Sequence, residues 1–145
     1  ILWHPDEAGI AFRSFRNAPA PTDTPAKRLS QMRELSRRFK CRLIGDGGSV
    51  EQLRILPQPV YRYQVDGQNI VDGALFAFAQ GTDPEAIVTL EAVRQDGKLA
   101  WRYALTRRTV IALEVDVDGE RVWSVPASAG SPGAIWFQSN ITPAP

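Results

Sequence analysis

The chain has 145 residues, of which 43% are hydrophobic, and its 17 Lys and Arg against 16 Asp and Glu give a net charge of +1. This length suits one domain, residues 1–145, which can bury a core without disulfides or metal ions. The single cysteine, Cys41, excludes an intrachain disulfide and a cysteine-cluster metal site, and the single histidine, His4, excludes a histidine-rich one. We therefore expect no metal and no cofactor. No apolar run in the sequence reaches the roughly 20 residues of a membrane-spanning helix.

Residues 1–23 are predicted to form an irregular N-terminal arm, because prolines recur there at a density that breaks both helix and sheet. Three aromatic side chains lie in the arm: Trp3, Phe12 and Phe15. They either hold the arm against its own domain, which we favour, or dock it on a partner. The chain opens on Ile1 and its one methionine is Met32, so we expect an upstream segment, and a secretory signal, a disordered leader and an adjoining domain all fit.

Residues 24–41 are predicted to form the one helix of the chain, from Pro25 to about Lys40. Thr24 suits the N-cap position, and Pro25 suits the first helical position. Apolar residues then recur at spacings of three, three and four: Leu29, Met32, Leu35 and Phe39. This spacing gives one apolar stripe, so the helix is amphipathic.

Positive charge is concentrated on this helix. Residues 24–42 carry seven Lys and Arg and one Glu, so their net charge is +6 and the rest of the chain carries −5. Such a face can bind an anionic partner, for which we single out Arg33, Arg37, Arg38 and Lys40. The alternative, which we favour, is a solvated face whose charged groups pair with carboxylates of the sheet. Nucleic acid is disfavoured, because the pI near 8.1 is modest and no base-stacking motif accompanies the basic residues.

Residues 42–139 are predicted to form an antiparallel sheet, because apolar and polar side chains alternate with period two over much of this range. The expected strands are residues 50–56, 60–64, 74–79, 86–93, 99–106, 110–117, 121–125 and 134–139. Asp96-Gly97 and Asp118-Gly119 are typical two-residue hairpin turns, so we expect closely joined strands to pair in sequence order. Residues 140–145 are expected to form a tail.

One of these strands carries a competing helical signal. Asp83 before Pro84 and Glu85 is typical of a helix start. We favour a strand over residues 84–94, because β-branched residues are frequent from 87 to 93 and a hairpin turn follows.

These elements predict an α+β fold in which the helix packs on a curved, mostly antiparallel meander of about six to eight strands. The bend at Pro57-Gln58-Pro59 and the glycine-containing turns favour strong curvature. Whether the sheet closes part of the way into a barrel stays open.

The leading hypothesis for the function is a non-enzymatic binding or protein-interaction domain that uses the concave face of this sheet for an unknown small molecule or protein. The candidate ligand-binding residues are Tyr61, Tyr63, Trp101 and Tyr103. Ligand sites at the mouths of sheets combine aromatic walls with a few polar groups, and these side chains supply both. The alternative for the two tyrosines at 61 and 63 is core packing.

The runner-up is a hydrolase-like enzyme with an acid/base site built from two convergent carboxylates. Asp83 and Glu85 fall in one loop, and Glu91, Glu114 and Asp116 lie on predicted strands. Any two could converge, but nothing in the sequence selects a pair. No serine or cysteine lies in a recognisable nucleophile motif. We therefore predict no catalytic residue.

Three segments resemble a family of uncharacterised bacterial proteins that are expected to be exported. They are Leu53–Tyr63, Asp72–Phe78 with Gln80–Glu85, and Trp101–Leu105. The resemblance covers roughly residues 27–126, and no activity, ligand or site residue is known for the family. It implies an export signal ahead of the chain, and hence an exported or periplasmic location.

Overall fold

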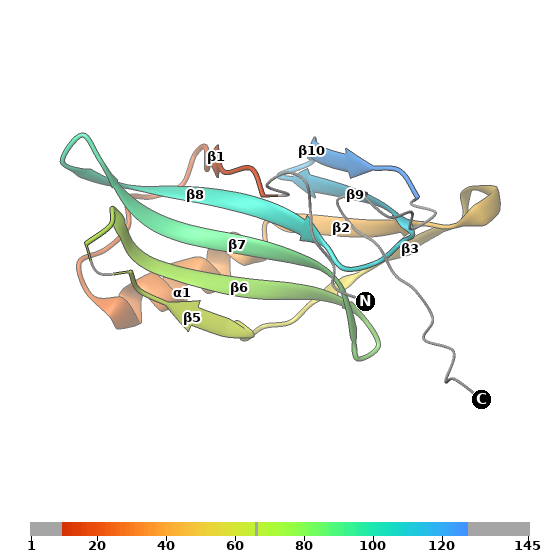
Figure 1. Cartoon of the computed structure of the whole chain (residues 1–145), viewed down its shortest axis with the longest axis horizontal. Helices are drawn as coiled ribbons and strands as arrows, with labels where there is room; N and C mark the ends of the chain where they lie inside the picture. The colour runs from red at the N-terminus through yellow and green to blue at the C-terminus, as the bar shows by residue number, and fades with distance from the viewer. Residues whose placement is uncertain (1–9, 66, 128–145) are drawn as a thin grey trace, which may run out of the picture.

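The computed structural model describes residues 10–65 and 67–127 of the chain (Figure 1). In these residues one α-helix, α1 (Pro25–Ser36), packs with antiparallel strands that form two sheets, and a short 3-10 helix, η1 (Asp46–Gly48), lies between two of the strands. The predicted α+β class is therefore confirmed. The strand predicted over residues 134–139, the tail at 140–145 and the side chains of Trp3 and His4 lie outside the described residues.

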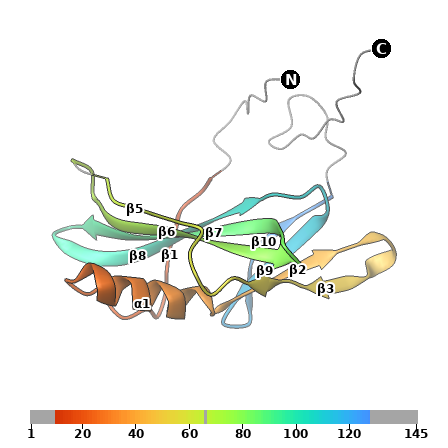
Figure 2. The same cartoon turned by 90° about the horizontal axis from the view of Figure 1, so that it is seen from below.

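Sheet A has the strand order β1-β8-β7-β6-β4, with β5 as a further partner of β6, and it curls into half of a barrel (Figure 2). Its strands are β1 (Arg13–Ser14), β4 (Arg54–Ile55), β5 (Tyr61–Tyr63), β6 (Ile70–Gln80), β7 (Asp83–Gln95) and β8 (Lys98–Arg107). Asp96 and Gly97 form the turn between β7 and β8 with φ of 50° and 75°. The strand predicted over residues 84–94 is confirmed, because pairing with β6 and β8 on both sides outweighs the local helix signal.

The Pro-Gln-Pro segment interrupts one edge of sheet A. Ile55 of β4 pairs with Phe78, and Tyr61 of β5 pairs with Leu75 further back along β6. Pro57 and Pro59 lie between the two short strands and lack the N–H groups that a continuous ladder needs. Pro57-Gln58-Pro59 therefore separates β4 from β5 along this edge of sheet A.

Sheet B has the strand order β10-β9-β2-β3, which corrects the expectation that all closely joined strands pair in sequence order. Its strands are β2 (Phe39–Ile44), β3 (Val50–Gln52), β9 (Ala112–Val117) and β10 (Glu120–Val125). β9 pairs with β2 rather than β8, because the segment between β8 and β9 turns the chain away from sheet A. The side chain of Arg107 holds this corner by donating to the carbonyls of Thr109 and Ile111 at 2.9 and 3.0 Å.

The helix is shorter than the sequence predicted. α1 ends at Ser36, and Phe39 begins strand β2 instead of completing the apolar stripe of the helix. Phe39, Cys41 and Leu43 are all buried, so the alternation with period two that defines β2 already starts at residue 39. Leu35 and Phe39 therefore lie in two different elements, α1 and β2, and both pack in the same core.

α1 and sheet B cover the same face of sheet A and lie next to one another (Figure 2). One hydrophobic core lies between them, and its fully buried side chains include Met32 of α1, Phe76 of β6, Leu90 of β7 and Val115 of β9. We call the face of sheet A that covers this core the inner face and the opposite one the outer face.

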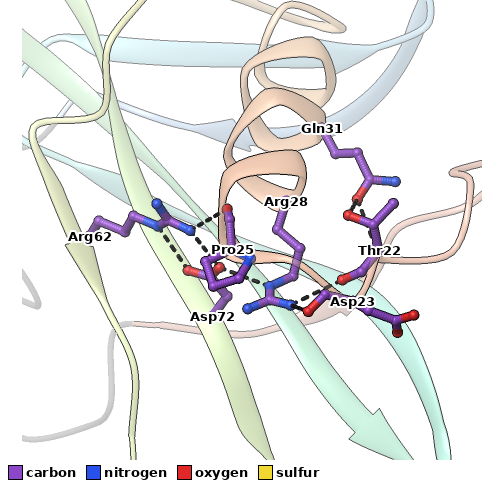
Figure 3. Close-up of polar contacts among 7 residues, drawn as sticks. All are labelled: Thr22, Asp23, Pro25, Arg28, Gln31, Arg62 and Asp72. Atoms are coloured by element: carbon purple, nitrogen blue, oxygen red, sulfur yellow. Dashed lines mark hydrogen bonds and ion pairs between the residues drawn. The ribbon is translucent and has the colours of Figure 1, made fainter.

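A buried ionic network fixes the start of α1 to the inner face of sheet A (Figure 3). Asp72 of β6 is fully buried, and it accepts from Arg28 Nε at 2.8 Å and from Arg62 Nη2 at 2.7 Å. Arg28 also donates to the carbonyls of Thr22 and Asp23 at 3.0 and 2.9 Å, and Arg62 donates to that of Pro25 at 2.6 Å. The predicted N-cap, Thr24, makes no side-chain cap bond, so these arginines hold the entry to the helix instead.

We expect Cys41 to be inert in the folded protein. Its thiol is fully buried in β2, and burial raises its pKa to about 12, so the nucleophilic thiolate is scarce at neutral pH. A maleimide reagent should label the protein only after unfolding in urea. Labelling of the native protein at the rate of a free thiol would contradict this packing.

Candidate functional site

A row of polar side chains crosses the outer face of sheet A. The strand register places Tyr63 opposite Gly73, Gly73 opposite Glu91, Glu91 opposite Arg102, and Arg102 opposite Ser14. Directly opposed residues of antiparallel strands project to the same face, so these five residues form one line across five strands. We call this line the polar row.

The centre of the polar row is Glu91, whose side chain is almost fully buried at 4% exposure. The hydroxyl of Tyr63 donates to Glu91 Oε1, and Arg102 donates to Oε2 through Nε at 2.6 Å. Burial and the hydrogen bond to Glu91 raise the pKa of Tyr63 far above its usual value of 10.0, so its proton stays in place. Because both oxygens of Glu91 are occupied, its part is to position Tyr63 and Arg102.

Gly73 leaves room for the ring of Tyr63. A Cβ atom at Gly73 would lie 2.4 Å from Tyr63 Cζ, which is far inside van der Waals contact. The ring therefore lies flat over a strand position that only glycine can occupy, with its hydroxyl reaching Glu91 on the next strand.

We expect Gly73→Ala to displace Tyr63 and to lower the free energy of unfolding by about 1–3 kcal/mol, the usual cost of overpacking. Urea denaturation of the variant measures this loss. The matched control is the same change in a Tyr63→Ser background, where the ring is absent and alanine should be nearly neutral. Equal losses in both backgrounds would contradict the contact.

A cavity of about 580 Å³ opens at the Arg102 end of the polar row, next to the turn between β7 and β8. Its walls come from the start of β1, the segment before β6, the end of β7 and the start of β8. Phe12 lies against the site, with the guanidinium carbon of Arg102 at 4.2 Å from its ring centroid. Three amide side chains line the cavity, Gln68, Asn69 and Gln95, and among the described lining residues there is no carboxylate.

The four predicted aromatic residues do not form one site, because they lie on opposite faces of sheet A. Tyr61 is 63% exposed and stacks with Tyr63 on the outer face, with ring centroids 6.1 Å apart. Trp101 and Tyr103 are buried on the inner face, where Trp101 Nε1 donates to the carbonyl of Pro19 at 3.0 Å. Of the four, Tyr63 belongs to the polar row, and Trp101 contributes to the cavity wall.

The four residues predicted for an anionic partner do not share a helix face either. Only Arg33 belongs to α1, Arg37 is its exposed C-cap residue, and Lys40 is exposed on β2. Arg38 pairs with Asp118 of the turn between β9 and β10, and it also lies over the ring of Phe15 at 4.6 Å. Asp118 thus engages one of the four predicted cations, Arg38, which lies beyond the end of the helix.

Three of the carboxylates considered for an acid/base site, Glu91, Glu114 and Asp116, are engaged by arginines. Asp116 accepts from Arg42 at 2.7 Å and from Arg121 at 2.5 Å on sheet B, and Glu114 lies 2.7 Å from Arg121. The hydrogen bonds from Arg121 and Arg42 hold the pKa of Asp116 below its ordinary value of 3.8. A proton donor at neutral pH needs the opposite shift.

Within residues 10–65 and 67–127, no three His, Cys, Asp or Glu side chains gather in a way that could hold a metal ion. No helix in that part of the chain is both long and apolar enough to cross a membrane.

No protein-family model, curated protein sequence or solved structure matches the chain. The resemblance to uncharacterised bacterial proteins, with the exported location that it implies, therefore stays a prediction.

Proposed function

We propose that the protein is a non-enzymatic binding domain that takes a small ligand in the cavity on the outer face of sheet A. The observation that carries this proposal is the cavity itself, whose largely polar lining includes a few apolar side chains, among them Phe12, and a guanidinium held in place by Glu91. A volume of about 580 Å³ lies in the range of small-molecule sites, which are typically about 300–1,000 Å³. The predicted site was a face of the sheet with four aromatic residues. The proposed site also lies on a sheet, but on the outer face of sheet A at the Arg102 end of the polar row.

Binding is favoured over catalysis because the buried carboxylates serve as partners of arginines. Glu91 on the outer face and Asp72 on the inner face each accept hydrogen bonds on both oxygens. A carboxylate that is buried and paired with arginines in this way orients its neighbours and is poorly placed to accept a proton from a substrate.

The test is a thermal-shift screen of the whole chain against small acids, sugars, amines and nucleotides. A ligand that binds the folded state raises the melting temperature in a concentration-dependent way. We expect at least one hit whose effect disappears in Ser14→Trp, which fills the cavity from the exposed edge strand β1. If every ligand raised the melting temperature of Ser14→Trp as much as that of the unmodified chain, the binding site would lie elsewhere and the proposal would be wrong.

A further inference from the structure

We propose that the ligand of this cavity is a small organic acid and that Arg102 binds its carboxylate. This inference rests on the proposed function and adds the chemical class of the ligand. Its elements are the orientation of the Arg102 side chain, the charge around the cavity and the neutral donors that surround it.

Arg102 is held with one edge of its guanidinium still available. Glu91 Oε2 accepts from Nε and lies 2.6 Å from Nη2, which occupies the edge of the group nearest the sheet. None of the described residues accepts from Nη1, and the side chain is 34% exposed. The ring of Phe12 covers one face of the guanidinium, so the remaining donors point in the plane of the group. A carboxylate binds such an edge in the same plane with two parallel hydrogen bonds.

The charged groups around the cavity leave room for an anion. Arg13, Arg94 and Arg102 belong to its lining, no described carboxylate does, and the carboxylate of Glu91 is buried against Arg102. The register places Arg13 opposite Tyr103 of the inner face, and its guanidinium donates to the carbonyl of Val122 on β10, so its side chain points away from the outer face. Arg94 alternates with Val93 and Gln95 along β7 and also points to the other face, so Arg102 is the cation that an anionic ligand meets in the cavity.

The neutral donors favour a carboxylate on an organic body over a phosphate. Gln68, Asn69 and Gln95 offer amide groups, and Ser14 offers a hydroxyl next to Arg102. Phe12, Ile70 and Val93 supply apolar contact for the rest of the ligand. Phosphate sites in proteins usually add a helix N-terminus or a glycine-rich backbone cradle, and β-strand ends and a short loop form these walls instead.

The experiment is an NMR titration of the whole chain with matched probes that differ in one group: glucuronate, glucose and glucose 6-phosphate, and benzoate against benzamide. We expect the acids to shift the backbone amides of Ser14 and Gln95 and the Nε–H of Arg102, with little effect from glucose or benzamide. Arg102→Gln should weaken the binding of the acids about tenfold or more, the loss typical of a charge-assisted hydrogen bond. Arg37→Gln removes the same charge far from the cavity and should leave binding unchanged.

Arg102→Lys serves as a second variant, because Arg102→Gln leaves Glu91 without its cation and can affect folding. Lysine keeps the charge and lacks the planar edge, so it should restore the fold and only part of the affinity. Equal binding of glucose and glucuronate at the same amides would overturn the inference and leave the proposed function intact. Tighter binding of glucose 6-phosphate than of glucuronate would overturn it too, as would Arg102→Gln that binds the acids normally.

Discussion

Asp72→Ala should lower the free energy of unfolding by about 3–5 kcal/mol, the usual cost of removing one partner of a buried ion pair. Asp72 is fully buried and is the carboxylate partner of both Arg28 and Arg62. Its loss leaves Arg28, which is 4% exposed, with a buried charge and no counter-ion. Chemical denaturation followed by circular dichroism measures the difference.

The control for this variant is Asp118→Asn, which removes the charge and tolerates the positive φ of 51° at this turn position. Asp118 also pairs with an arginine, Arg38, but its side chain is 49% exposed. Water screens such a pair, so we expect a loss below about 1 kcal/mol. Similar losses for the two variants would show that the network in Figure 3 contributes no more than a surface pair.

Phe15→Ala should cost about 3–5 kcal/mol, the range for truncating a buried phenylalanine. Phe15 lies 8% exposed in the arm, and its ring meets Phe39 and Tyr103 edge to face at centroid distances of 5.5 and 5.4 Å. Its amide also donates to the carbonyl of Trp101 at 2.9 Å, which continues the pairing of β1 with β8. The loss therefore measures how firmly the arm is held to its own domain.

Phe12→Ala is the matched control for the arm, because Phe12 is 38% exposed on the other face of β1. We expect it to cost less than about 1 kcal/mol, since an exposed ring loses little burial. If Phe15→Ala were as mild as Phe12→Ala, the arm would be free to leave the domain, and docking on a partner would become the better interpretation. Urea denaturation of both variants decides between the two.

Part of the candidate site could be predicted from the sequence. A two-residue turn at Asp96-Gly97 fixes the register of its hairpin, so Gln95 pairs with Lys98 and, four steps on, Glu91 pairs with Arg102. The sequence analysis did not predict this charge pair, because Trp101 and Tyr103, on which the predicted site was based, lie on the opposite face of β8 from Arg102. The alternation that placed Trp101 and Tyr103 together was correct, and both are buried against the core.

Other parts of the site depend on long-range register that local patterns do not encode. β5 pairs with β6 at Tyr63 and Gly73, and β6 shifts register against β7 between Ile70 and Asp72. The position of Tyr63 over Gly73 and beside Glu91 therefore follows from tertiary packing. The same limit applies to β9, which joins sheet B instead of pairing with β8. This depends on the corner between β8 and β9, where Arg107 donates to the carbonyls of Thr109 and Ile111. The helix end was misplaced because Phe39 satisfies the helical spacing and the strand alternation at once.

The most direct measurement is a set of intermolecular nuclear Overhauser contacts between the protein and the first ligand that raises its melting temperature. The account predicts contacts from the ligand to the methyl groups of Val93 and to the ring of Phe12, on the outer face of sheet A beside Arg102. Contacts to α1, or to sheet B with none to these two side chains, would contradict it.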